Sequence, residues 1–375
     1  KAAEEILNDS LMTGDESSQM ETMMRTIKGI KRDFGENYRV FLPDGLSVSA
    51  RQIVTKIFEY LKETAERECG GNNISSVHLT HPVGFSVSQK SLLKSVAEDA
   101  GFLEVELLPE PIAATKGYLT TEGDLGSNIL VFDLGAGTLD LSFVHDDPIL
   151  GYHLPVPPLG KLDCGGDDFD RLFYDYLESV YLQKNEPEFS SNRNLLNLSI
   201  LLQCRLAKEK LSRNEEINFK ASVKHSILKV SRQQFNSVIA KKFQECIALT
   251  EQMLRNIKNA GYKIDTVLLI GGSSRIPYLR TELEKILPVK PRQYMYTDTA
   301  VAMGAVADVR IKPTAKKQPP RPIWPGRLHD RVLIRLSRAR IGSGRCIRTT
   351  HPRCRRRCSS VHSSGSRSRR RCIRP

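Results

Sequence analysis

The sequence has 375 residues, of which 40% are hydrophobic and 26% charged, which is enough for two domains or for one domain with two lobes. No stretch approaches the roughly 20 consecutive apolar residues of a membrane helix, and no secretory leader opens the chain. We therefore expect a cytoplasmic protein without a membrane segment. The first residue is Lys1 and not methionine, which favours a fragment. Residues 312–375 hold 20 of the 56 basic and one of the 43 acidic residues, so residues 1–311 carry 36 basic and 42 acidic residues. Their net charge of −6 gives this part no general electrostatic reason to bind nucleic acid.

The first third of the chain alternates helical and extended patterns. Residues 49–68 have apolar side chains at Ile53, Ile57 and Leu61, the spacing of an amphipathic helix, and Ser49 is a candidate N-cap. The following pattern predicts a strand over 75–83, a helix over 88–101, a strand over 103–109, a helix from Pro111 and a β-hairpin over 129–145.

Helices and strands continue to alternate in the remaining sequence. The pattern predicts a glycine turn and helix over 163–183, a helix over 197–212, a strand pair within 216–230, a helix over 231–262, a strand–turn–helix unit over 264–287 and a helix over 298–309. Two comparable halves of this kind indicate an α/β fold.

The predicted hairpin, "ILVFDLGAGTLDLSFVH", has a loop with almost no side chains. Gly135, Ala136 and Gly137 let the backbone approach a ligand and direct several N–H groups to one point, and Thr138 adds a hydroxyl. The sequence has no GxxxxGK[ST] motif, and a dinucleotide fingerprint would need strand–turn–helix. We therefore interpret the loop as a phosphate-binding hairpin.

Carboxylates flank this loop. Asp133 and Asp140 would repel bare phosphates, so a phosphate site here requires a cation, and acidic groups can hold a hydrated Mg²⁺ through its waters. Glu110 lies at a predicted helix start, where it could face the same cation. The alternative is an acidic hairpin whose glycines only turn the chain.

Two further glycine pairs lie at helix starts. In "GGSSRIP", Gly271 and Gly272 clear space after a buried strand, and the guanidinium of Arg275 could stack on a base. In "DCGGDDFD", residues 163–170, a glycine pair opens a helix whose amide groups favour phosphate. The alternative for the first motif is a plain strand–helix turn with a surface arginine.

The ordered motifs resemble a known family. The set "LPEPIAATKGYL", "LVFDLGAGTLDLS", "CGGDDFDRLF", "LAKEKLS", "LIGGSSRIPYLRTEL" and "DTAVAMGAV" resembles the nucleotide-binding domain of the 70-kDa heat-shock (DnaK-like) chaperones, which share the actin-like ATPase fold. The resemblance implies two α/β lobes around a nucleotide cleft. The implied parts are a first lobe over 1–127, a second lobe over 128–296, a closing helix over 297–311 that returns to the first lobe, and a disordered tail over 312–375.

The resemblance also implies roles for single residues. Asp133 would orient the attacking water, with Thr138 beside it, Asp140 and Glu110 would hold Mg²⁺ through water, and Lys31 would stabilise charge on the γ-phosphate unless it is a solvated lysine. ATP or ADP would bind the hairpin loop through Gly135, Ala136 and Gly137, and on the adenosine side Gly165, Gly166, Lys208, Ser212, Gly271, Gly272, Ser273 and Arg275. Implied partners are unfolded client proteins, J-domain co-chaperones and nucleotide-exchange factors.

The sequence also departs from the family pattern. It contains no first phosphate loop of the form DLGTT, Ala136 replaces a glycine, and Arg205 and Glu209 reverse the usual acid–base order. After Val309 neither the family's linker nor its peptide-binding domain is recognisable. We therefore expect a fragment with impaired hydrolysis. The alternatives are an actin-superfamily scaffold or filament protein and nucleic-acid binding through the tail.

The basic tail allows three interpretations. Residues 318–375 contain 17 arginines and no lysine. They could be a nucleic-acid-binding arm, the translation of an unrelated reading frame, or a metal site formed by Cys346, His351, Cys354, Cys358 and Cys372. In the body of the chain no metal-type spacing occurs, so we expect free thiols at Cys69, Cys164, Cys204 and Cys246.

Overall fold

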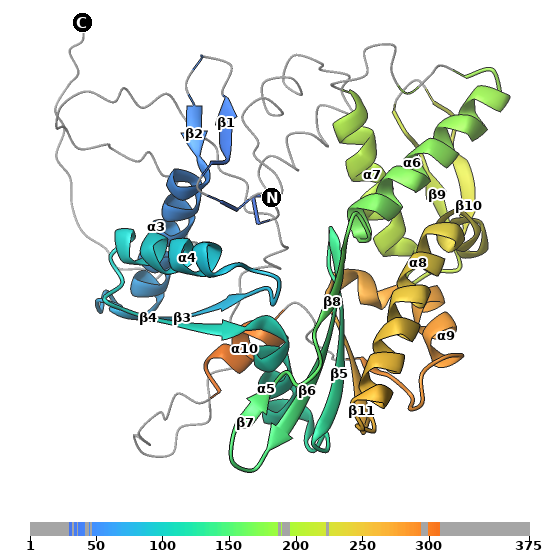
Figure 1. The fold of residues 1–375 in the computed structure, drawn as a ribbon. Helices are drawn as coiled ribbons and strands as arrows, with labels where there is room; N and C mark the ends of the chain where they lie inside the picture. Colours follow the sequence, from blue (N-terminus) through green and yellow to red (C-terminus); the bar gives the residue numbers. More distant parts are fainter. Residues whose placement is uncertain are drawn as a thin grey trace, which may run out of the picture. The chain divides into compact units, whose positions relative to one another are not determined.

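The computed structural model describes the central part of the chain, all of it within the compact unit Lys1–Arg335 (Figure 1). The described residues are 30–31, 34–35, 37–41, 45, 47–186, 189, 196–222, 225–293 and 299–307. The hypotheses on the tail, 312–375, fall outside them.

The first third of the chain contains a small parallel sheet with two helices. Strands β3 (Ser76–His81) and β4 (Glu104–Pro109) pair in parallel, and α4 (Val87–Asp99) connects them. Helix α3 (Ala50–Glu68) starts at a capping box, in which the Ser49 hydroxyl accepts from the Gln52 amide and the Gln52 side chain accepts from the Ser49 amide. The predicted helix cap and the strand–helix–strand order are confirmed. A short antiparallel pair, β1 (Arg39–Phe41) and β2 (Ser47–Ser49), was not predicted.

The central sheet carries the predicted hairpin. Its order is β12-β11-β5-β6-β7, with β8 also paired to β6. The strands are β5 (Asn128–Leu134), β6 (Thr138–Asp147), β7 (Gly151–His153), β8 (Leu159–Leu162), β11 (Thr266–Ile270) and β12 (Arg292–Gln293). Strands β5 and β6 are antiparallel with Asp133 opposite Asp140, whereas β11 runs parallel to β5 with Ile270 opposite Asp133. The hairpin is confirmed, but β7, β8 and β12 were not predicted.

Both faces of the central sheet are covered, because successive side chains of a strand point to opposite faces. On one face Leu130 and Phe132 pack in a large apolar cluster with α6 to α9, and on the other Ile129 and Val131 pack with α5 and α10 (Figure 1). The helices are α5 (Glu110–Glu122), α6 (Gly166–Gln183), α7 (Leu196–Leu211), α8 (Arg232–Asn259), α9 (Pro277–Glu284) and α10 (Ala300–Ala305). Strands β9 (Glu216–Phe219) and β10 (Leu228–Ser231) form a separate antiparallel pair.

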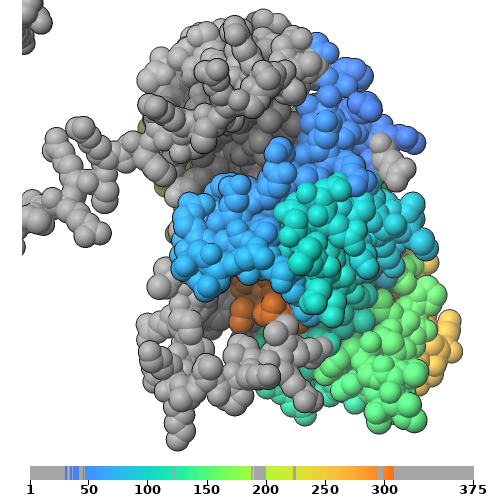
Figure 2. All heavy atoms as spheres, turned by 90° about the vertical axis from the view of Figure 1, so that its left-hand side faces the viewer, coloured from blue at the N-terminus to red at the C-terminus, as the bar shows by residue number. Residues whose placement is uncertain are grey.

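Helices α5 and α10 cross at glycines. A Cβ on Gly304 would lie 1.6 Å from the Ala113 carbonyl oxygen, and one on Gly117 would lie 2.1 Å from that of Ala300. Only glycine allows backbones to approach this closely. In Figure 2, part of α10 (orange) is visible beside the blue-to-cyan segments of the first half of the chain. The crossing thus joins the end of the described chain to its first third.

Candidate functional site

The hairpin loop leaves open space beside its backbone. Its amide at Gly135 donates to the Thr138 carbonyl oxygen at 3.1 Å, which closes a tight turn between β5 and β6. The nearest atom that a Cβ on Gly135 would meet is that same carbonyl oxygen, at 3.9 Å. The side of Gly135 on which a Cβ would lie is therefore open to a ligand, as a phosphate-binding loop requires.

Three carboxylates converge beside this loop. Glu110, at the start of α5, and Asp133 and Asp140, on the paired strands, line one pocket. The Nζ of Lys31 lies 2.8 Å from Oε1 of Glu110. The remaining lining residues are Pro82, Val83, Pro111, Val131, Ser142 and Ile270. The structure therefore brings together four residues that the sequence singled out from three separate segments.

The electrostatics of this pocket favour a cation. Burial raises the pKa of Asp140, and the negative charge of Glu110 raises it further, whereas a hydrogen bond from the Thr138 hydroxyl (2.9 Å) and the charge of Lys31 oppose the rise. A carboxylate that is costly to ionise in a pocket with other carboxylates is stabilised by a bound cation. Among the described residues, no group of three or more His, Cys, Asp or Glu side chains is close enough to ligate a metal directly. The carboxylate oxygens of the pocket are the donor type that Mg²⁺ takes, and this ion keeps most of its waters when bound.

A second glycine loop packs against the first. The Gly166 amide donates to the Gly135 carbonyl oxygen at 3.1 Å, and the Asp167 amide donates to that of Ala136 at 2.6 Å. A Cβ on Gly165 would lie 2.6 Å from both the Ala136 oxygen and the Gly137 nitrogen. The glycine pair at the start of α6 is therefore needed for contact between the two loops.

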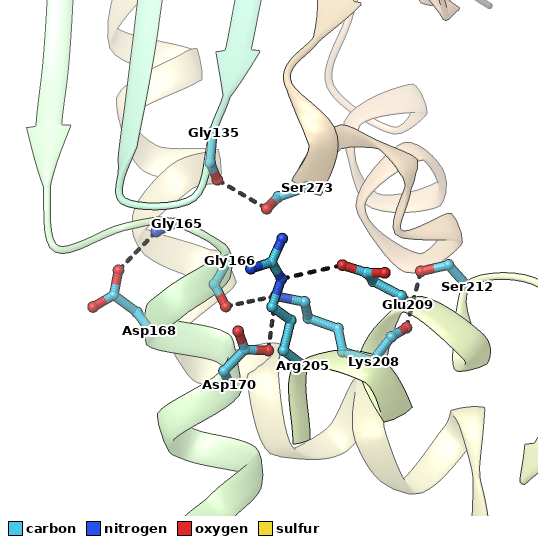
Figure 3. A network of polar contacts seen from close by, with 10 residues as sticks. All are labelled: Gly135, Gly165, Gly166, Asp168, Asp170, Arg205, Lys208, Glu209, Ser212 and Ser273. Atoms are coloured by element: carbon cyan, nitrogen blue, oxygen red, sulfur yellow. Dashed lines mark hydrogen bonds and ion pairs between the residues drawn. The ribbon is translucent and has the colours of Figure 1, made fainter. Parts of the chain in front are cut away.

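The third loop, after β11, joins the same contact. Gly271 has φ +79° and would place a Cβ 2.4 Å from the Leu134 carbonyl oxygen. The hydroxyl of Ser273 donates to the Gly135 carbonyl oxygen at 2.8 Å (Figure 3). Gly271 was expected to clear space for a ligand; in the structure it allows close packing of three loops. Arg275 ends the short 3₁₀ turn Gly272–Arg275 and is partly exposed.

The lysine predicted on the adenosine side is held inside the protein. The Nζ of Lys208 lies 2.7 Å from Oδ1 of Asp170 and donates to the Gly166 carbonyl oxygen at 2.7 Å (Figure 3). Both side chains of the ion pair are buried, and burial raises the pKa of Asp170 while the Lys208 charge lowers it. The sequence analysis did not select Asp170 as a site residue. Its position among the apolar residues of α6 could have indicated a buried carboxylate that needs a positively charged partner.

Two charged residues of α7, and the serine that follows this helix, make contacts along the same stretch of chain. Arg205 Nε donates to Glu209 Oε1 at 3.2 Å, so these two side chains form an ion pair one helical turn apart. The hydroxyl of Ser212 donates to the carbonyl oxygen of Lys208, four residues earlier, at 3.2 Å. Figure 3 shows these residues and the two glycine loops in one polar network.

Comparison with known families agrees with this arrangement. The family described as Hsp70 protein matches residues 15–318, which is most of the chain. None of the described helices combines the length and apolar character needed to cross a bilayer. This family has the actin-like ATPase fold, and the mixed α/β architecture of the chain agrees with it. The chain belongs to the Hsp70 protein family.

Proposed function

We propose that the chain binds ATP and ADP with Mg²⁺ and acts as the nucleotide-dependent part of a protein-folding chaperone. The observation that supports this best is the convergence of Glu110, Asp133 and Asp140 on one pocket beside the open backbone of Gly135. Phosphates bound to the loop amides would lie close to these carboxylates. A magnesium ion between the two charges makes the arrangement favourable.

The proposed roles follow from the chemistry of the side chains. Asp140 and Glu110 would hold hydrated Mg²⁺ through its waters, and the ion supplies positive charge that offsets that of the phosphates. Asp133 would accept a hydrogen bond from the attacking water and so orient it. Lys31 pairs with Glu110 and is 64% exposed, and its ammonium group would stabilise negative charge on a γ-phosphate.

Hydrolysis and chaperone action form the wider part of the proposal. The 375 residues contain no DLGTT loop, so we propose nucleotide binding with slow hydrolysis for this stretch of chain. Clients, J-domain co-chaperones and nucleotide-exchange factors are the proposed partners by family membership. No observation on the described residues favours the filament or nucleic-acid alternatives.

Isothermal titration with Mg·ATP and Mg·ADP tests the site. The wild-type chain should bind both nucleotides. Replacing Lys31 by methionine removes a charge-assisted contact worth about 1.5–3 kcal/mol, so ATP affinity should fall roughly 10- to 100-fold while ADP affinity stays within about twofold. Gly135→Ala fills the open space beside the loop and should weaken both nucleotides.

Lys56→Met is the matched control. Lys56 is 65% exposed and pairs with Glu59, much as Lys31 is 64% exposed and pairs with Glu110. This variant should bind both nucleotides as the wild type does. Equal losses for ATP and ADP in Lys31→Met would contradict the proposed contact with the γ-phosphate. Absence of nucleotide binding by a correctly folded wild type would contradict the proposed function itself.

A further inference from the structure

Two buried cysteines meet where the second glycine loop contacts α8. Cys164 precedes the glycine pair that opens α6, and Cys246 lies on α8, 82 residues later. Their Sγ atoms are 2.6 Å apart, and both residues are fully buried. Bonded sulfurs lie about 2.05 Å apart, so the two atoms need to approach by only about 0.5 Å to form a bond.

The backbone around Cys164 directs its side chain toward α8. Asp163, the preceding residue, has φ 57°, a left-handed conformation that is uncommon for residues other than glycine. Gly165, the following residue, is extended with φ −156°. A turn of this kind is retained when surrounding contacts hold it, and here those contacts bring Cys164 against Cys246.

The surroundings make the two thiols chemically different. The hydrogen bond with Cys246 and the charge of Lys242 lower the pKa of Cys164, whereas the same bond and burial raise that of Cys246. Lys242 lies one helical turn before Cys246, with Nζ 3.6 Å from Oδ2 of Asp163 and 3.0 Å from Oε2 of Glu245. Cys164 is therefore the better nucleophile and Cys246 the partner that resolves it.

We propose that Cys164 and Cys246 form a reversible disulfide when the protein meets a small peroxide such as hydrogen peroxide. The Cys164 thiolate attacks one peroxide oxygen, the O–O bond breaks, and the released hydroxide takes a proton to become water. The Cys246 sulfur, losing its proton, then attacks the sulfenic acid on Cys164, the S–O bond breaks and a second water leaves. Two thiols are oxidised by two electrons, and one peroxide is reduced to two waters.

The bond would tie α8 to the loop that packs against the hairpin. Gly166, two residues after Cys164, donates its amide to the Gly135 carbonyl oxygen. Closing a loop of 82 residues in the unfolded chain should raise Tm by about 5 to 10 °C. Formation of the bond does not depend on the proposed nucleotide binding, so the two can fail separately.

Peptide mapping of the full chain tests the proposal directly. The native protein is treated with hydrogen peroxide, alkylated with N-ethylmaleimide and digested with trypsin without reduction. Trypsin places Cys164 in peptide 162–171 and Cys246 in peptide 243–255, each with a single cysteine. We expect the covalent pair of these peptides as the main cross-link, and its loss after treatment with dithiothreitol.

Variants and melting curves complete the test. Cys246→Ser should abolish both the cross-link and the rise in Tm, whereas Cys204→Ser, which alters another buried cysteine, and Cys69→Ser, which alters an exposed one, should retain both. Cys164→Ser should behave as Cys246→Ser does. If Cys164→Ser fails to fold, the comparison of Cys246→Ser with the wild type is sufficient. Cross-links spread over the eight cysteines, sulfinic acid on Cys164 without a cross-link, or a link formed only after unfolding in urea would overturn the proposal.

Discussion

Replacing Gly271 by alanine should destabilise the fold through two separate effects. The backbone there has φ +79° and ψ 148°, a region occupied almost only by glycine, which costs a side-chain residue about 1–3 kcal/mol. The added Cβ would also lie 2.4 Å from the Leu134 carbonyl oxygen and 2.5 Å from Oδ1 of Asp133. Leu134 belongs to the central sheet, so its carbonyl group cannot move away without disturbing the strand. The overpacking therefore adds about 1–3 kcal/mol to the loss of stability. We expect a total loss of about 2–6 kcal/mol.

Gly261→Ala is the matched control for the clash. Gly261 has φ +84°, but a Cβ there would meet no atom within 4 Å, so only the backbone cost of about 1–2 kcal/mol applies. Urea unfolding followed by far-ultraviolet circular dichroism measures the loss of stability in both variants. This signal comes from the backbone, so the fluorescence of the single tryptophan, Trp324, is not needed. If Gly271→Ala loses no more stability than Gly261→Ala, the argument from loop packing is wrong.

Two carboxylates give the remaining predictions. Because burial raises the pKa of Asp140 in the fold, its favourable contribution is present below its unfolded pKa of about 3.9 and is lost as pH rises through the folded pKa. Asp140→Asn should therefore raise Tm at pH 7 without nucleotide and leave it unchanged near pH 4, and a calorimetric scan with a lower Tm at pH 7 would contradict this sign. Asp170→Asn leaves the buried ammonium of Lys208 without its counter-charge and should cost about 3–5 kcal/mol in urea unfolding, whereas Asp170→Leu combined with Lys208→Met should cost clearly less. Equal losses in the single and the double variant would show that the ion pair is not the reason.

Periodicity and turn chemistry were enough to predict most helices and the central hairpin. The missed strands are short: β1, β2 and β7 have three residues each, β8 four and β12 two. A strand of this length shows no alternation of its own, and it forms because a longer neighbour offers hydrogen bonds. Strand β8 shows this, since it adds to β6 just after a proline-rich segment.

The candidate site was predictable in composition but not in contacts. The sequence identified Glu110, Asp133 and Asp140 by motif, and the structure brings them to one pocket. It could not show that Gly271 serves loop packing, because close approach between residues 137 positions apart (271 minus 134) has no local pattern (Leu134 O to the Gly271 Cβ position, 2.4 Å). For the same reason the partner of Cys164 could not be chosen among the other cysteines.

The glycine crossing of α5 and α10 has a consequence for how the chain is made. Gly304 follows Gly117 by 187 residues (304 minus 117), so a ribosome adding about 5–20 residues per second needs roughly 10 to 40 s to deliver the second helix after the first. During that interval the face of α5 that receives α10 has no partner from its own chain. Contacts of such long sequence separation also form late in refolding. Nascent chains of this protein therefore carry an exposed helix face while these 187 residues are added, and such a face is a site at which assistance or aggregation can begin.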